Sequence, residues 1–300
     1  MEVVLKLVIM REPMLYRSVV VGLLARDCKE AILRNKPRIE KLCSFFDEYH
    51  IVVVENDSVD GTKELLHDWA QENGRVMVDS FTDESKRLAD CSVERISHMA
   101  DLRNRLLGDI RRLPVHDIVI MMDVDIFDFD VEGVIDGICH APDDWGAIMA
   151  NGRLTLPNHK LYKYQYDQYA FLAYDEDWHD AMYFQQKRGR MLDKRVRKNA
   201  YYPVKSAFGG IGVYRYDAIK DLHYQAVRLK EHPQDAFCEH IPFHLEIIRQ
   251  GYQNYVCRRM TVNSGLLEVK PWVAFLMCYL PQVYEMLCKV SAFMYKMNWR

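Results

Sequence analysis

Alternating strand-like and helix-like segments limit the folds open to this chain more than any other feature. Apolar, β-branched runs indicate buried strands, and apolar residues at helical spacing indicate amphipathic helices. The predicted strands lie at 17–27, 51–62, 75–81 and 117–125, and the predicted helices at 37–50, 60–74 and 92–113. Because strands that alternate with helices form βαβ units, we predict an α/β fold whose mostly parallel sheet is covered by helices on both faces.

Polar residues follow three of the predicted strands, at Ala25–Asp27, Glu55–Ser58 and Asp123–Asp125. In an open parallel sheet the carboxyl ends of the strands meet at one edge, which is where ligands bind. We therefore expect these three segments to line one crevice. The acceptors and donors of the 55–58 segment suit a ribose and a base edge, and a purely structural Asx-type turn is the alternative.

The segment "DIVIMMDVDIFDFD" places acidic residues directly after an apolar run. Asp123 and Asp125 are two positions apart on a strand end, so their carboxylates point to the same side. Closely spaced carboxylates repel one another unless a positive group lies among them. Oxygen ligands of this kind suit Mg²⁺ or Mn²⁺, and a helix N-cap followed by a solvated turn is the plainer interpretation.

Composition and charge narrow the class of protein. Apolar residues make up 49% of the 300 residues and charged residues 28%, which is ordinary for a globular protein, and the net charge of −3 gives no reason to expect a nucleic-acid partner. None of the eight cysteines forms a C-x-x-C pair, which favours a reducing compartment. Asn56 begins a glycosylation sequon inside the predicted crevice, and a glycan there would block the crevice. Both observations favour a cytoplasmic location.

The organisation of the chain suggests one main domain and a distinct C-terminal segment. No repeat or low-complexity linker interrupts residues 1–265, which we predict to form a single domain. Residues 266–300 are rich in aromatic residues, Met and Leu, and Pro281 interrupts them. The uncharged stretch of this segment is shorter than the roughly 20 residues needed to span a bilayer. We expect it to pack on the domain as helices, or to lie on a membrane surface as a peripheral contact.

Two segments of the second half admit both a structural and a functional interpretation. Residues 187–198 are strongly basic, which fits a solvated surface loop or a flap that closes over a diphosphate or an anionic acceptor. The Tyr, Trp and Asp residues of 162–184 suit either stacking against sugar rings or a place in the core. Within this cluster His179, which is flanked by acids, is expected on the surface.

Five motifs together resemble a known family. "VVENDSVDGT", "MADLRN", "IMMDVD", "FGGIGVYR" and "CEHIPFH" occur in this order between residues 18 and 263. Their order is similar to that of GT-A-fold glycosyltransferases, and more narrowly resembles the capsule-associated mannosyltransferase-like group. The resemblance implies a GT-A-like, Rossmann-type sheet. It also implies a metal-dependent enzyme that moves a sugar from a nucleotide-diphosphate sugar to a hydroxyl of a glycan or other acceptor.

The resemblance also implies roles for individual residues. The nucleotide-sugar-binding positions would be Ala25, Arg26, Asp27, Glu55, Asn56, Asp57, Arg103, Asp123, Val124, Gly209 and Gly210. The metal, Mn²⁺ or Mg²⁺, would be held by Asp123 and Asp125 with a late contact from His244 or His240. Glu239 matches the position of the catalytic base in inverting relatives. Here Glu239 is followed by His240 rather than by a second acid, which leaves open whether the reaction inverts or retains.

Other classes fit part of the sequence. "VIMMDVDIF" also matches the first motif of haloacid-dehalogenase-like phosphohydrolases, but three predicted strands precede it and no later G-D-x-x-x-D segment follows. A sugar nucleotidyltransferase would need a Gly-rich phosphate loop, which is missing from 17–35. A non-catalytic nucleotide-sugar-binding or lectin-like module stays open, and the acids at positions 123, 125 and 239 count against it.

Overall fold

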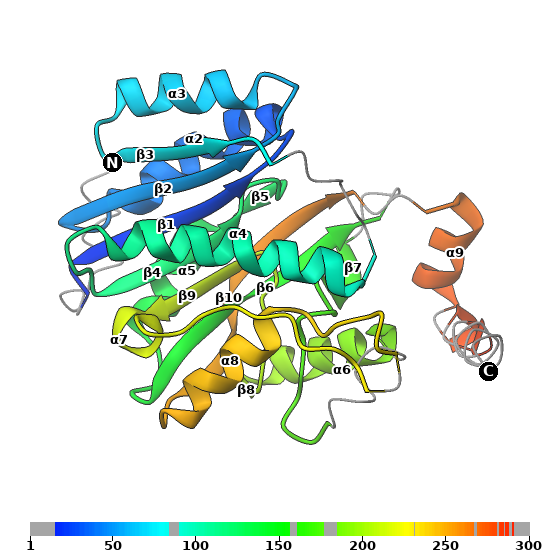
Figure 1. The fold of residues 1–300 in the computed structure, drawn as a ribbon. Helices are drawn as coiled ribbons and strands as arrows, with labels where there is room; N and C mark the ends of the chain where they lie inside the picture. The colour runs from blue at the N-terminus through cyan, green and yellow to red at the C-terminus, as the bar shows by residue number, and fades with distance from the viewer. Residues whose placement is uncertain are drawn as a thin grey trace, which may run out of the picture.

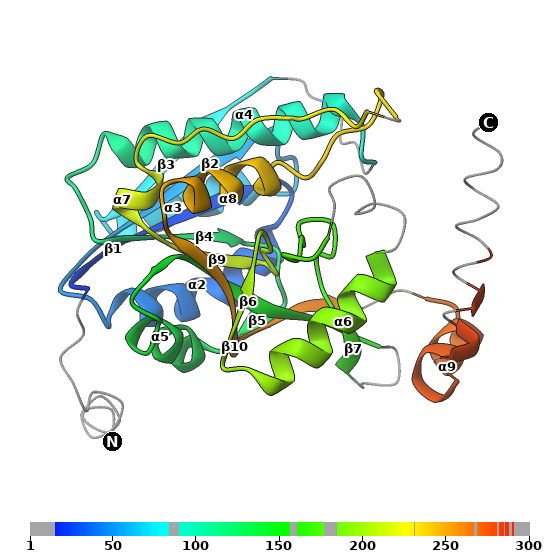
Figure 2. The same cartoon turned by 90° about the horizontal axis from the view of Figure 1, so that it is seen from below.

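The computed structural model describes residues 16–83, 90–156, 161–176, 185–230, 232–266, 269–280, 282–284, 286–287 and 290. The described residues form one large twisted sheet with helices packed on both of its faces (Figure 1). The view in Figure 2 separates the layers, with α4, α7 and α8 on one side of the sheet and α2 and α5 on the other. The predicted α/β fold is confirmed.

The strands are β1 (Ser18–Ala25), β2 (Glu48–Asn56), β3 (Val76–Phe81), β4 (Ile118–Asp123), β5 (Asp128–Phe129), β6 (Trp145–Thr155), β7 (Leu161–Gln165), β8 (Tyr201–Val204), β9 (Ile211–Arg215) and β10 (Gln253–Leu266). The helices are α2 (Lys29–Cys43), α3 (Thr62–Glu72), α4 (Val93–Arg111), α5 (Val131–Cys139), α6 (Gln185–Lys198), α7 (Tyr216–Ile219), α8 (His240–Arg249) and α9 (Pro271–Tyr279). Strand order along the sheet is β3-β2-β1-β4-β9-β6-β10-β5, with β7 paired to β6 and β8 to β10.

The N-terminal half of the sheet is parallel, as the sequence predicts. β3, β2, β1 and β4 pair in parallel register, so β1 and β4 both end at the same edge: Leu24 lies opposite Asp123. After β4 the pairing is mixed, because β9 runs antiparallel to both β4 and β6 while β10 runs parallel to β6. The less regular sequence beyond residue 140 corresponds to this mixed half.

Alternate residues of the central strands supply two separate cores. On β1, Val19 and Val21 pack on the side of α2 and α5, whereas Val20 packs on the side of α4. Because both faces are covered, the central strands read as continuous apolar runs rather than as alternating ones. Gly22 lets α4 approach closely, since a Cβ there would lie 3.2 Å from side-chain atoms of Leu106 and Ile110. The strand ends are thereby fixed relative to α4.

Helix α2 differs from the predicted segment at 37–50. It begins at Lys29 and ends at Cys43, with Pro37 inside it, and β2 begins at Glu48. A proline in a helix interior costs a hydrogen bond. The buried face of α2, which includes Ile32, Ile39 and Leu42, continues through the proline and compensates for that loss.

The C-terminal helix α9 makes a small contact with the rest of the fold. Met277 of α9 packs with Leu156, which follows β6, while Trp272 and Phe275 are exposed. Among the described helices none is both long and apolar enough to cross a membrane. The division of the chain at residue 265, and a membrane contact through this segment, stay predictions.

Candidate active site

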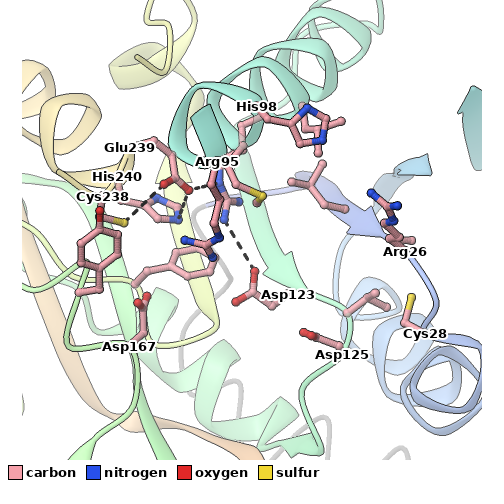
Figure 3. A pocket seen from close by; sticks show the side chains of 18 of the residues that line it. Arg26, Cys28, Arg95, His98, Asp123, Asp125, Asp167, Cys238, Glu239 and His240 are labelled. Carbon is pink, nitrogen blue, oxygen red and sulfur yellow. Dashed lines mark hydrogen bonds and ion pairs between the residues drawn. The ribbon is translucent and has the colours of Figure 1, made fainter. Parts of the chain in front are cut away.

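A pocket of about 520 Å³ opens at the carboxyl ends of β1 and β4 (Figure 3). Its walls come from the ends of β1, β2 and β4, from α4, from the segment after β7 and from the residues that lead into α8. Ala25, Arg26, Asn56 and Asp123–Asp125 all line it. The structure therefore brings the three predicted strand-end segments to one crevice.

The local fold holds the two aspartates of the D-x-D segment at the pocket. Asp123 is the last residue of β4, and its backbone N–H donates to the carbonyl of Gly210 at 3.0 Å. The side-chain amide of the buried Asn35 donates to the carbonyls of Val124 and Ile126 at 3.1 Å and 2.7 Å. These bonds fix the turn that follows β4. Asp125 is exposed at the rim of the pocket. Asp123 lies in the pocket wall, where desolvation raises the pKa of its carboxyl group.

A buried arginine lies at the centre of the acidic wall. Arg103 of α4 donates from Nε to Glu239 Oε1 at 2.8 Å, and its Nη2 lies 3.8 Å from Asp123 Oδ1. Its guanidinium also lies over the rings of Phe208 and Tyr224, at 5.3 Å and 5.8 Å from their centroids. Burial, the largest single effect, opposes the charge on Arg103, but Glu239, Tyr224 and Asp123 together outweigh it and hold the pKa of Arg103 above its usual value. The two charged groups are thus locked together.

His240 follows Glu239 at the start of α8. Its ring stacks on Phe208 with centroids 4.2 Å apart, and burial followed by the charge of Arg103 lowers its pKa. Within the described residues neither ring nitrogen has a hydrogen-bond partner. A neutral imidazole, whose Nε2 lies 3.8 Å from Glu239 Oε1, therefore borders the pocket.

Asp167 is a pocket residue that sequence reasoning missed. It follows β7 with φ of 58°, in the left-handed region, and lines the pocket with Tyr166. Burial and the neighbouring Glu239 raise the pKa of Asp167 to about 7. The only sequence signal is an acid inside the aromatic segment 162–184, which gives no hint that the loop turns back toward β4.

Three predicted nucleotide contacts brace the pocket from outside rather than line it. Glu55 Oε1 accepts from the backbone N–H of Ser58 at 2.9 Å and its other oxygen bonds the Ser80 hydroxyl. Asp27 accepts from the N–H of Val59 at 2.9 Å. Asp57 lies 3.8 Å from Arg26. These side chains join the loops after β1 and β2, so of the contacts predicted at the ends of these two strands only Ala25, Arg26 and Asn56 line the pocket.

The glycines and His244 also lie behind the pocket wall. Gly209 and Gly210 have φ of 67° and 91°, and a Cβ on Gly209 would lie 2.5 Å from the carbonyl oxygen of Ala150. His244 is fully buried, with Nδ1 2.9 Å from the Ser206 hydroxyl and Nε2 2.9 Å from the Tyr214 hydroxyl. Burial lowers the pKa of His244 to about 3. The structure does not bring His244 to the D-x-D aspartates.

The predicted basic segment forms α6 away from this pocket. Arg195 pairs with Asp175 at 3.0 Å, and Arg197 and Arg153 both pair with Asp193. Arg195 and Arg197 are therefore compensated within the fold, and a flap role of the segment stays a prediction. His179 lies outside the described residues.

The donor set fits a divalent cation that shares its shell with a ligand. In the part of the chain that the structure describes, no group of three or more Asp, Glu, His or Cys residues is arranged to hold a metal ion. Among the described residues, five carboxylates and three guanidinium groups line the pocket. Asp123 and Asp125 supply two of these five carboxylates. Magnesium-type sites commonly use one or two carboxylates and leave the remaining positions to water and phosphate.

Comparisons with solved structures agree with the fold. The mannosyltransferase PcManGT from Pyrobaculum calidifontis, in complex with GDP-Man and Mn²⁺, matches with a TM-score of 0.52 and 14% identity, over 95% of this chain and 70% of that one. GalNAc-T7 with UDP, GalNAc and Mn²⁺ matches with a TM-score of 0.48 and 14% identity, over 86% of this chain and 45% of that one. The likeness to PcManGT, at 14% identity, concerns the fold, which is that of GT-A glycosyltransferases.

Sequence comparison gives the family. No curated protein sequence matches the chain significantly. The model of the family described as cryptococcal mannosyltransferase 1 matches residues 19–246, which is more than half of the chain and includes Asp123, Asp125, Asp167 and Glu239. The chain therefore belongs to this mannosyltransferase family of GT-A glycosyltransferases.

Proposed function

We propose that the chain transfers a sugar from a nucleotide-diphosphate sugar to a hydroxyl of a glycan or related acceptor, with a divalent cation held by Asp123 and Asp125. The observation that carries this proposal is the meeting of the β1, β2 and β4 ends with Arg103 and Glu239 in a single pocket. Its volume of about 520 Å³ is within the range of small-molecule sites.

The charge of the pocket supports a cation together with an anionic donor. Asp125 is exposed at the rim and Asp123 faces inward, so both offer oxygen ligands, and we propose Mn²⁺ or Mg²⁺ between them. When bound, the cation supplies Lewis-acid neutralisation of the charge that grows on the departing diphosphate. His244 is left out of this proposed ligand set because both of its ring nitrogens are bonded elsewhere.

The side chains around the cation have distinct proposed tasks. Arg26 and Asn56, at the ends of β1 and β2, would contact the nucleotide from one wall. Arg103 would present a fixed positive charge, since Glu239 and the flanking rings hold its guanidinium in place. If the reaction inverts, a carboxylate would take the proton of the attacking hydroxyl, a role that the resemblance to inverting relatives implies for Glu239.

The family and the fold favour a mannosyl donor. The matching family is described as a mannosyltransferase, and PcManGT was solved with GDP-Man. We therefore propose GDP-mannose as the first donor to examine, with a glycan hydroxyl as acceptor. The phosphohydrolase and the non-catalytic binder remain the outcomes against which the proposal is tested.

A donor screen tests the function. Purified protein is incubated with nucleotide-diphosphate sugars, with Mn²⁺ or with a chelator, and release of the nucleotide diphosphate is measured alongside the glycosylated acceptor. We expect transfer only with metal. Release of phosphate from monoesters without any sugar transfer would indicate the hydrolase, and donor binding without turnover would indicate the binding module.

Asp125→Ala is the first variant to compare. It removes one of the two proposed ligands at an exposed position, so we expect at least a hundredfold loss of metal-dependent transfer with the thermal stability unchanged. Asp143→Ala removes an exposed aspartate from the turn before β6 and serves as the matched control. Equal activity of the two variants would contradict the metal role of Asp125.

A further inference from the structure

A second pocket, of about 440 Å³, lies at the opposite end of the sheet from β3, where β5, β6 and β10 meet the end of α6. Figure 2 shows α6 beside β7 and β10 in this region. The polar side chains that line it, among the described residues, are Asp128, Asn151, Arg153, Arg197, Thr261 and Asn263. None of these six lines the first pocket at the ends of β1 and β4, so the second pocket is a separate site.

One buried aspartate holds the two arginines of the second pocket. Asp193 of α6 pairs with Arg153, and its carboxylate also accepts from Arg197 Nε at 3.2 Å and lies 3.0 Å from Arg197 Nη2. The side chain of Asp193 is 6% exposed and that of Arg153 is 12% exposed, whereas Arg197 is 63% exposed. The Arg153 guanidinium is therefore fixed in the wall before any ligand binds, which lowers the entropic cost of binding.

Two asparagines are held in the same wall. The side-chain amide of the buried Asn151 donates to the carbonyl of Arg258 at 3.1 Å. Asn263 Oδ1 accepts from the backbone N–H of Gly265 at 3.1 Å. Among the described residues, none bonds the side-chain nitrogen of Asn263 or the carboxylate of Asp128. One donor group and one acceptor group of known direction are therefore open to a ligand.

The lining of the second pocket suits sugar hydroxyls better than an anion. A hydroxyl both donates and accepts, and the lining offers guanidinium donors, a carboxylate acceptor, and amide and hydroxyl groups that do both. The carboxylates of Asp128 and Asp193 balance the guanidiniums of Arg153 and Arg197, so these groups leave no excess positive charge to hold a phosphate. A neutral glycan is the ligand class that fits this balance.

Short backbone connections join the second pocket to the first. Asp128 comes three residues after Asp125 at the rim of the first pocket, a span of at most about 11 Å. Tyr166, which lines the first pocket, donates its backbone N–H at 2.8 Å to the carbonyl of Gly152, the residue before Arg153. These links place the two pockets within reach of one oligosaccharide.

We propose that the second pocket binds a neutral glycan, and that this glycan is the part of the acceptor beyond the hydroxyl that reacts. The acceptor role rests on the glycosyl transfer proposed above, whereas glycan binding itself does not require that function. The second pocket should favour oligosaccharide acceptors over monosaccharides, because only the longer molecules reach both pockets.

Isothermal titration in chelator and without nucleotide tests glycan binding alone. The probes are short neutral oligosaccharides of mannose, glucose, galactose and xylose, with inorganic phosphate as the anionic comparison. We expect saturable binding of at least one oligosaccharide and no binding of phosphate. Binding of phosphate alone, or of none of these probes, would overturn the proposal.

Three variants locate the bound oligosaccharide. Arg197→Ala removes an exposed donor while Asp193 keeps Arg153 as a partner, so the affinity should fall at least about tenfold. Thr261→Trp puts a large side chain into the pocket from an exposed position of β10 and should abolish binding. Arg259→Ala is the matched control, because this arginine is 61% exposed and its ion pair lies outside the pocket. Equal affinity in all three variants would overturn the site, and thermal unfolding shows whether each variant is folded.

The transfer assay then tests the acceptor role. With the bound oligosaccharide as acceptor, Arg197→Ala should raise the KM for the acceptor at least about fivefold and leave the KM for the donor unchanged. An unchanged KM for the acceptor would overturn the acceptor role. A wild-type protein that binds the oligosaccharide, loses this binding in Thr261→Trp and transfers no sugar from any nucleotide donor would overturn the proposed function and leave the glycan site standing.

Discussion

At the residue scale, one buried arginine organises the charges of the site. Arg103 touches Glu239 directly and lies near Asp123, which links α8 to the end of β4 through a single side chain of α4. A buried ion pair contributes little net stability but is costly to break from one side. Its value here lies in fixing the wall against which the donor and the acceptor would meet.

The raised pKa of Asp167 has a consequence for stability. Its pKa is about 7 in the fold against the ordinary 3.8, so the ionised form is disfavoured in the folded protein. Stability that is present at low pH is therefore lost as the pH rises from about 4 through about 7. Asp167→Asn removes this penalty. At pH 8 and in the presence of a chelator, we expect the free energy of unfolding of this variant to exceed that of the wild type by roughly 2–4 kcal/mol, so the variant should unfold at a higher temperature.

The same comparison at lower pH provides the control. At pH 4 the Asp167 carboxyl is protonated in the folded protein and about two-fifths protonated in the unfolded chain, so the difference in stability should shrink to about 0.5 kcal/mol. Differential scanning calorimetry between pH 4 and pH 8 measures the difference directly. A gap that stays constant, or that widens toward acid, would refute the assignment of a raised pKa to this residue.

At the element scale, the parallel half of the sheet could be predicted because its strands are continuous apolar runs. Val19, Val20 and Val21 are all fully buried. Consecutive residues of a strand point to opposite faces of the sheet, so all three can be buried only where both faces are covered. Parallel pairing then places Leu24 opposite Asp123, so the meeting of the strand ends follows from the fold. The sequence pattern was therefore enough to predict that these distant motifs come together.

No sequence pattern indicated Asp167, and the sequence predicted His244 and Glu55 at the pocket. The true positions of these residues depend on the paths of loops and on the directions of side chains. Asp167 reaches the pocket only because the strand pair β6–β7 turns back, and no periodic pattern encodes that turn. His244 is on the first turns of α8 like His240, yet the Ser206 and Tyr214 hydroxyls hold its ring inside the core. Glu55 accepts from the backbone of Ser58 in the loop after β2 and from the hydroxyl of Ser80 on β3, and it does not line the pocket.

The turn before β9 has a specific structural requirement. Gly209 has φ of 67° and its missing Cβ would lie 2.5 Å from a backbone oxygen of Ala150, so any side chain strains both the turn and the sheet. We expect Gly209→Ala to reduce the free energy of unfolding by at least about 2 kcal/mol. Chemical denaturation with urea measures this quantity.

A second glycine provides the comparison for that experiment. Gly108 is inside α4, and a Cβ there meets nothing within 4 Å. Gly108→Ala should therefore leave stability unchanged or raise it by about 0.5–1 kcal/mol, because alanine has the higher helix propensity. Equal losses in the two variants would show that the turn at Gly209 does not need glycine.

At the scale of the whole molecule, the parallel edge, the α4 arginine and the approach to α8 form one site on a GT-A fold. The C-terminal helix α9 stands apart from that site and exposes Trp272, Phe275 and Tyr279 (Figure 1). Six cysteines of the described residues are free thiols, including Cys28 and Cys238 in the pocket wall. A cytoplasmic location and a peripheral membrane contact remain predictions.

The central claim is that a cation held by Asp123 and Asp125 binds a nucleoside diphosphate in the pocket below α4. Isothermal titration of the protein with GDP and UDP, in Mn²⁺ and then in chelator, measures it most directly. We expect saturable binding of at least one nucleotide in Mn²⁺, with an affinity that falls at least tenfold in chelator and by the same factor in Asp125→Asn. Binding with the same affinity under all three conditions would contradict it.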